Sequence, residues 1–270
     1  MMHPRVSLNQ VGFLSESTPA FIQFCREIGV SNAVIASSLA MGQELLDETL
    51  AALAPGGVHV PCIVQPFARY PDLERDDGGA GEHMNRAIEA AAALSARHVY
   101  MITGGRGNLS WEAAAARFVE LIAPCIEHAR AHGIGLLIET SNLFNIDIHI
   151  AHTLEDTIKL AEMSGIGHCL DIGAAWVESD LKGKFARAVS TTGLVQLCDY
   201  VPGDRTTPCK SVPGDGVIPL ERIVGDLLGL GYEGVFDLEL VGQRIVAEGH
   251  RAAFERGAEA LSELLIKLGA

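Results

Sequence analysis

The chain has 270 residues, of which 48% are hydrophobic, so we expect one large domain over residues 1–270. Its 34 Asp and Glu residues outnumber its 20 Lys and Arg residues, which gives a net charge of −14. Because this charge repels phosphate backbones and anionic lipids, and no local basic patch opposes it, we expect neither nucleic-acid nor membrane binding.

The first ten residues, MMHPRVSLNQ, lack the charged start and the long apolar stretch of a signal peptide. We therefore expect a cytoplasmic protein. The six cysteines form no C-x-x-C pair and no zinc-finger spacing, and in a reducing compartment they are expected to be free thiols.

Short apolar stretches typical of strands alternate with helical stretches eight times along the chain. The predicted strands are RVSLNQ (5–10), NAVIASS (32–38), VHVPCIVQPF (58–67), HVYMIT (98–103), GLLIET (135–140), HCLDIG (168–173), LVQLCD (194–199) and GVFDLELVG (234–242). Helical stretches include 43–54, 83–96, 111–133, 153–165 and 220–232, followed by a final helix. Ser110 and Thr153 are predicted to start two of them, and Gly165 to end one.

Eight strand–helix units in a chain of this length predict an α/β fold, a single (β/α)8 TIM barrel, with a doubly wound sheet as the alternative. The longest irregular stretch, 200–219, follows the seventh predicted strand. Barrel enzymes build their sites from such loops, so we expect this one to contribute to function.

Each of the last four predicted strands carries an acid or an amide on the face opposite its large apolar side chains: Glu139, Asp171, Gln196 and Glu239. Burying several acids together costs several kcal/mol each unless they are protonated or share a cation. This pattern favours a divalent metal site. Alternatively, each acid is a solvated strand end or the partner of an Arg, and Gln196 is a neutral core residue.

The segments LLIET, HCLDIGAAW, LVQLCDYVPGDRTTPCKSVPGDGVIPL and GYEGVFDLELVG, in this order, resemble the xylose isomerase-like TIM-barrel superfamily, the sugar phosphate isomerase/epimerase group. The resemblance covers nearly the whole chain. It implies one divalent ion held by Glu on the fifth strand, Asp on the sixth, His on the seventh and Glu on the eighth. Glu139, Asp171 and Glu239 match that pattern.

Two positions depart from the family pattern. Gln196 stands in place of the seventh-strand His, and Ala174 stands where a substrate-contacting His is often found. An amide oxygen is a competent ligand for a hard cation, and some dehydroshikimate dehydratases of the family resemble this chain in having Gln there. The resulting ligand set, Glu139, Asp171, Gln196 and Glu239, contains only oxygen and favours Mn²⁺ or Mg²⁺ over Zn²⁺.

The resemblance implies an isomerase or epimerase of a sugar or related polyhydroxy carbonyl compound. Glu139 and Glu239 are then the catalytic acid and base, which move a proton through an enediolate. Arg205, in the loop after the seventh strand, matches a position from which family members contact their substrate. Asn142, in the long connection after the fifth strand, is a further predicted substrate contact.

Two alternatives remain open. The first is a metal-dependent dehydratase of the 3-dehydroshikimate type, in which Gln65 and Arg69 contact the substrate, because IVQPFARY is similar to a stretch of those enzymes. The second is a non-catalytic barrel that binds a small molecule. Relatives are often dimers or tetramers, so the resemblance is compatible with a homo-oligomer.

Overall fold

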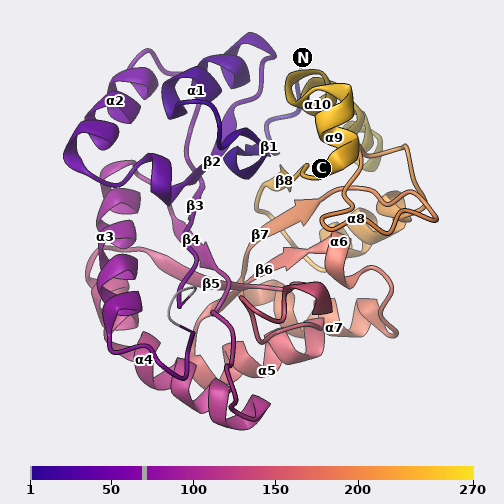
Figure 1. Ribbon diagram of the computed structural model, residues 1–270. Helices are drawn as coiled ribbons and strands as arrows, with labels where there is room; N and C mark the ends of the chain where they lie inside the picture. Colours follow the sequence, from indigo (N-terminus) through magenta and orange to yellow (C-terminus); the bar gives the residue numbers. More distant parts are fainter. Residues whose placement is uncertain (1, 69–71) are drawn as a thin grey trace.

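The computed structural model of the protein describes residues 2–68 and 72–270, and its centre is a closed barrel of eight parallel strands (Figure 1). Neighbouring strands pair in chain order, and β8 closes the barrel by pairing with β1. The strands are β1 Val6–Asn9, β2 Asn32–Ala36, β3 Cys62–Val64, β4 His98–Met101, β5 Gly135–Glu139, β6 Gly167–Asp171, β7 Thr192–Leu197 and β8 Phe236–Leu238. The predicted barrel is confirmed, and the open doubly wound sheet is excluded.

Helices surround the barrel on the outside (Figure 1). The predicted helical stretches correspond to α2 Gln43–Leu53, α3 Gly79–Ala93, α4 Trp111–Ala131, α5 Leu154–Ser164, α8 Leu220–Gly229 and the final α10 His250–Leu268. The structure adds α1 Thr18–Glu27, α6 Ile172–Ala175, α7 Leu181–Ala188 and α9 Gln243–Glu248, with short 3-10 turns at η1 Gln10–Phe13, η2 Ser37–Leu39, η3 Leu143–Asn145 and η4 Val189–Thr191.

The predicted helix ends are confirmed by their hydrogen bonds. The Ser110 hydroxyl accepts the backbone N–H of Ala113 at the start of α4, and the Thr153 hydroxyl accepts that of Asp156 at the start of α5. Gly165 ends α5 with a φ of +74°, a conformation that other residues rarely adopt.

The strands bury two separate apolar layers. The larger layer lies between the strands and the helices and includes Leu136 and Ile138 of β5, whereas Leu137 of the same strand packs inside the barrel. The inner layer is small and consists of Val34, Cys62, Tyr100, Leu137, Cys169 and Leu194. Because this layer fills the barrel, the inward polar side chains at the strand ends are displayed above it.

Among the described residues, no helix is both long and apolar enough to cross a membrane.

Candidate functional site

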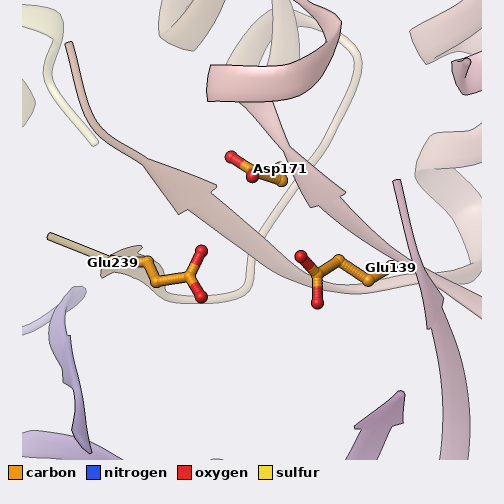
Figure 2. A group of neighbouring side chains, drawn as sticks. All are labelled: Glu139, Asp171 and Glu239. Atoms are coloured by element: carbon orange, nitrogen blue, oxygen red, sulfur yellow. The ribbon is translucent and has the colours of Figure 1, made fainter. Parts of the chain in front are cut away.

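Three acids converge at the carboxyl ends of the strands. Glu139 ends β5, Asp171 ends β6 and Glu239 follows β8. Each offers a carboxylate oxygen that lies within 4.8 Å of the other two, and Figure 2 shows Glu139 and Glu239 reaching toward each other with Asp171 between them. The strand register explains this convergence. Asp171 pairs with Gln196 and Gln196 with Asp237, so the carboxyl ends of β6, β7 and β8 lie at the same height along the barrel axis.

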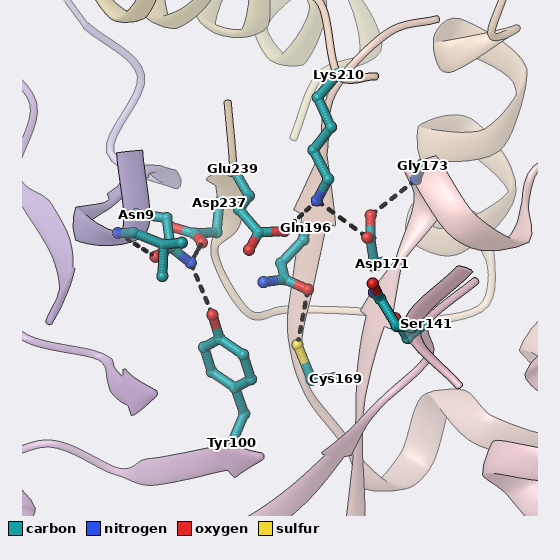
Figure 3. Close-up of polar contacts among 12 residues, drawn as sticks. Asn9, Tyr100, Ser141, Cys169, Asp171, Gly173, Gln196, Lys210, Asp237 and Glu239 are labelled. Atoms are coloured by element: carbon teal, nitrogen blue, oxygen red, sulfur yellow. Dashed lines mark hydrogen bonds and ion pairs between the residues drawn. The ribbon is translucent and has the colours of Figure 1, made fainter. Parts of the chain in front are cut away.

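Lys210 also belongs to this cluster, although the sequence analysis did not predict it as a site residue. Its ammonium group lies 3.0 Å from Asp171 Oδ2 and also pairs with the Glu239 carboxylate (Figure 3). Only 14% of the Lys210 side chain is exposed. One signal was present, because Lys210 is the single Lys of the loop 200–219 that was expected to be functional.

The loop that carries Lys210 is held by one buried acid, Asp199. Its carboxylate accepts the backbone N–H groups of Tyr200, Gly214, Gly216 and Ile218. The backbone of Asp199 also pairs with Ser211, the residue after Lys210. Asp199 therefore fixes the position from which Lys210 reaches the carboxylates.

The cluster carries more negative charge than Lys210 can neutralise. Burial raises the pKa of Glu139 well above its usual range, and repulsion from Glu239 and Asp171 raises it further. Burial also raises the pKa of Glu239, although Lys210 opposes the rise. Burial works to lower the pKa of Lys210, but Asp171 and Glu239 hold it well above its usual value. Three acids facing one ammonium group have the donor types and the excess charge that suit a divalent cation.

Gln196 is fully buried on β7, below Lys210 and Glu239 (Figure 3). Its Oε1 accepts a hydrogen bond from the Cys169 thiol at 3.2 Å, and its Nε2 has no hydrogen-bond partner among the described residues. A 180° rotation of the amide group exchanges the positions of Oε1 and Nε2, and Oε1 then no longer accepts from the weak thiol donor. The role of Gln196 as a ligand remains a prediction.

Asp237, two residues before Glu239, belongs to a separate buried network inside the barrel. Ser7 and Asn9 of β1 donate hydrogen bonds to its carboxylate, and Asn9 also donates to the Tyr100 hydroxyl (Figure 3). Burial raises the pKa of Asp237 to about 7 against the effect of these two donors. Because its oxygens are engaged with β1, Asp237 has a structural role.

A buried histidine supports the end of β5. His149 Nε2 donates to the backbone carbonyl of Glu139, and its Nδ1 accepts the backbone N–H of Thr103. Burial lowers the pKa of His149 to about 3, so its ring is neutral and can make both bonds at once. The ring thereby ties the end of β4 to the backbone of Glu139.

The predicted substrate contacts are distributed over two cavities. Gln65 lines a chamber of about 660 Å³ together with Glu139 and Glu239. Asn142 lines a smaller cavity of about 50 Å³ together with Asp171 and Lys210.

The other two predicted contacts are not placed at either cavity. Arg205 is exposed, lines neither of them, and donates to the Tyr200 hydroxyl and to the carbonyl of Asp204. Arg69 lies outside the described residues.

The sequence matches the family described as xylose isomerase-like TIM barrel over residues 22–264. No curated protein matches it. Three of the matching solved structures are a D-psicose 3-epimerase from Clostridium cellulolyticum H10 crystallised with D-tagatose, a probable 3-DHS dehydratase, AsbF, from Bacillus anthracis, and an IOLI protein with a bound zinc atom.

The epimerase is 15% identical with a TM-score of 0.80, and the match covers 98% of this chain and 99% of the other. The dehydratase is 16% identical with a TM-score of 0.76, and the match covers 96% of this chain and 98% of the other. The zinc-bound protein is 14% identical with a TM-score of 0.77, and the match covers 98% of this chain and 99% of the other. The TM-scores establish a common fold. At identities this low the activity of this chain has to be inferred from its own residues.

Proposed function

The chain belongs to the xylose isomerase-like TIM barrel family, and from this premise we propose that it is a divalent-metal-dependent isomerase or epimerase of a sugar or a related polyhydroxy carbonyl compound. The observation that carries the proposal is the convergence of Glu139, Asp171 and Glu239 at the carboxyl ends of three strands. This is the end at which TIM barrels place their active sites. The shared fold with a D-psicose 3-epimerase supports the reaction class.

In this proposal Glu139, Asp171, Gln196 and Glu239 hold the cation. When bound, the cation supplies Lewis acidity, which polarises the substrate carbonyl and makes the neighbouring carbon more acidic. Four oxygen donors favour Mn²⁺ or Mg²⁺, whereas the solved structure of the IOLI protein holds zinc. The metal preference is therefore part of the test.

Glu139 and Glu239 carry the proton transfer. They face one another from β5 and β8, so one carboxylate takes the proton from the carbon next to the carbonyl, and the other, which starts as a carboxylic acid, donates its own proton to the opposite face (Figure 2).

Lys210 stabilises the negative charge that develops on the substrate oxygen. With the carboxylates engaged by a cation, the long Lys210 side chain would be free to turn from Asp171 and Glu239 toward the substrate. A charged donor aimed at a developing oxyanion in a buried site lowers the barrier of the reaction.

Elimination of water is a second candidate reaction. It begins with the same proton removal and ends with the loss of a hydroxyl from the next carbon. The fold shared with a probable 3-DHS dehydratase supports it.

The test is proton exchange in D₂O, followed by NMR, with D-fructose, D-xylulose and 3-dehydroshikimate in turn and with Mn²⁺, Mg²⁺ or Zn²⁺. We expect the signal of the proton next to the carbonyl to disappear for one of these compounds, with an isomer, an epimer or an unsaturated product distinguishing the reactions. Exchange should be lost in Glu139→Gln and Glu239→Gln and kept in Glu263→Gln, a control on an exposed face of α10. Exchange that persists in both active-site variants contradicts the proposal, and no exchange with any compound favours a non-catalytic binding barrel.

A further inference from the structure

We propose that the substrate carries an apolar arm, of alkyl or aryl character, beside its hydroxylated carbonyl head, and that the 660 Å³ chamber beside Glu139 and Glu239 binds this arm. The inference rests on the proposed function for the identity of the head and adds the chemical class of the remainder of the substrate.

The chamber lies over the carboxyl ends of β2, β3 and β4 and has a mainly apolar wall. Glu139 and Glu239 occupy one side of it, where the head would react. The rest of the wall is built largely by the apolar side chains of Val11, Leu14, Ala36, Met41, Val64, Pro66, Phe67, Ile102 and Ile148.

Most of the polar side chains in this wall already bond to other parts of the protein. The Ser37 hydroxyl donates to Gln65 Oε1 at 2.6 Å, and Gln65 Nε2 donates one N–H to a backbone carbonyl, so these two residues use part of their hydrogen-bonding capacity within the wall. The remaining contacts join Tyr100 to Asn9, Asn145 to Ser141 and His83 to Arg86. Ser38 lies at the exposed rim.

This pairing decides which kind of arm the chamber favours. A hydroxylated arm loses its bonds to water on entry and, among the residues 2–68 and 72–270 that the structure describes, finds few side chains with free hydrogen-bonding groups. Each hydroxyl left unpaired lowers the affinity roughly tenfold. An apolar arm has no such bonds to lose and gains from leaving water. Sites that recognise hydroxyl groups instead present free polar groups to them.

The experiment compares two ligands with the same head. D-fructose has a hydroxylated arm, and its matched analogue carries a phenylethyl group in place of the last three carbons. Calorimetry with the Mg²⁺-loaded full chain gives the two Kd values, and proton exchange in D₂O reports the reaction separately. We expect the phenylethyl analogue to bind at least tenfold more tightly than D-fructose.

Val64, which ends β3 and lines the chamber, provides the variants. Val64→Phe narrows the chamber and should weaken binding of the analogue at least tenfold. Val64→Thr keeps the volume and adds a hydroxyl, and should weaken binding of the analogue several-fold, which covers the case in which the larger substitution fails to fold. Val246→Phe, on α9 where Val246 is 63% exposed, is the control and should change nothing.

The outcomes separate this inference from the proposed function. Tight binding of the analogue that depends on Val64, but without exchange of either ligand, supports the apolar chamber and counts against the isomerase. Exchange of D-fructose together with weak binding of the analogue overturns the apolar arm and leaves the isomerase standing. Binding of neither ligand, or Kd values that both Val64 variants leave unchanged, also overturns the inference.

Discussion

Replacing Lys210 with Met should make the protein depend on a divalent cation for its stability. The ammonium group pairs with Asp171 and Glu239, and 14% or less of each of the three side chains is exposed. Removing one partner of a buried ion pair typically costs about 3–5 kcal/mol, because the remaining charges lose their compensation. For a chain of this size we expect a fall in melting temperature of roughly 6–20 °C without metal.

A bound divalent cation should reduce this loss of stability, and a rise in pH should increase it. Mn²⁺ at about 100 times its Kd adds about 2.7 kcal/mol to the folded state, and it should stabilise the variant more than the wild type because no ammonium group competes for the carboxylates. Glu139 and Glu239 have raised pKa values in the folded protein, so the stability linked to them is present at low pH and is lost as the pH rises through those values. The difference between wild type and variant should therefore grow with pH.

The assay is thermal unfolding of both proteins in EDTA and in Mn²⁺ at several pH values. Equal melting temperatures in EDTA would show that the pairing of Lys210 does not stabilise the fold. Equal stabilisation by Mn²⁺ would show that Lys210 does not compete with the cation for the cluster.

In the proton-exchange assay, Glu139→Gln and Glu239→Gln should each lower kcat by about 10²–10⁴-fold, the usual contribution of a general acid or base, and an unchanged rate would contradict their roles. His149→Leu leaves two buried backbone groups unpaired, so it should lower the free energy of unfolding by about 2–5 kcal/mol in urea titrations. Wild-type stability should also fall as the pH drops from 6.5 to about 3, because the buried His149 ring stays neutral while the unfolded ring gains a proton. His149→Leu should reduce this dependence, and the part that remains includes that of His168, whose pKa burial lowers to about 4. Asp199→Asn should slow exchange roughly tenfold or more through the displaced Lys210 loop while Mn²⁺ stoichiometry is kept, and a normal rate would mean that the loop is held by other contacts.

The barrel and its three acids could be predicted because both follow from local sequence patterns. Alternation along a strand assigns Glu139 and Asp171 to the inner face from their immediate neighbours, and parallel strands then bring their ends together. No contact between distant residues has to be known for this step.

Lys210 and Gln65 could not be assigned in the same way, because their positions depend on contacts between distant segments. Lys210 reaches the acids only because Asp199 gathers the backbone of its loop, and no sequence periodicity records that folding. Gln65 was predicted as a substrate contact, but its amide is bonded to Ser37 from the neighbouring strand end and to a backbone carbonyl. The orientation of the Gln196 amide likewise depends on the Cys169 thiol of the neighbouring strand β6, 27 positions earlier in the sequence.

The most direct test of the metal centre is a calorimetric Mn²⁺ titration of the metal-free wild type beside Asp171→Asn. The Asn side chain removes one charge but can still accept the backbone N–H of Gly173, which Asp171 binds at the start of α6, so the variant should fold. We predict one Mn²⁺ per chain in the wild type and an affinity at least tenfold weaker in Asp171→Asn. No binding to the wild type, or equal affinity in both proteins, would contradict the assignment of these acids to a metal site.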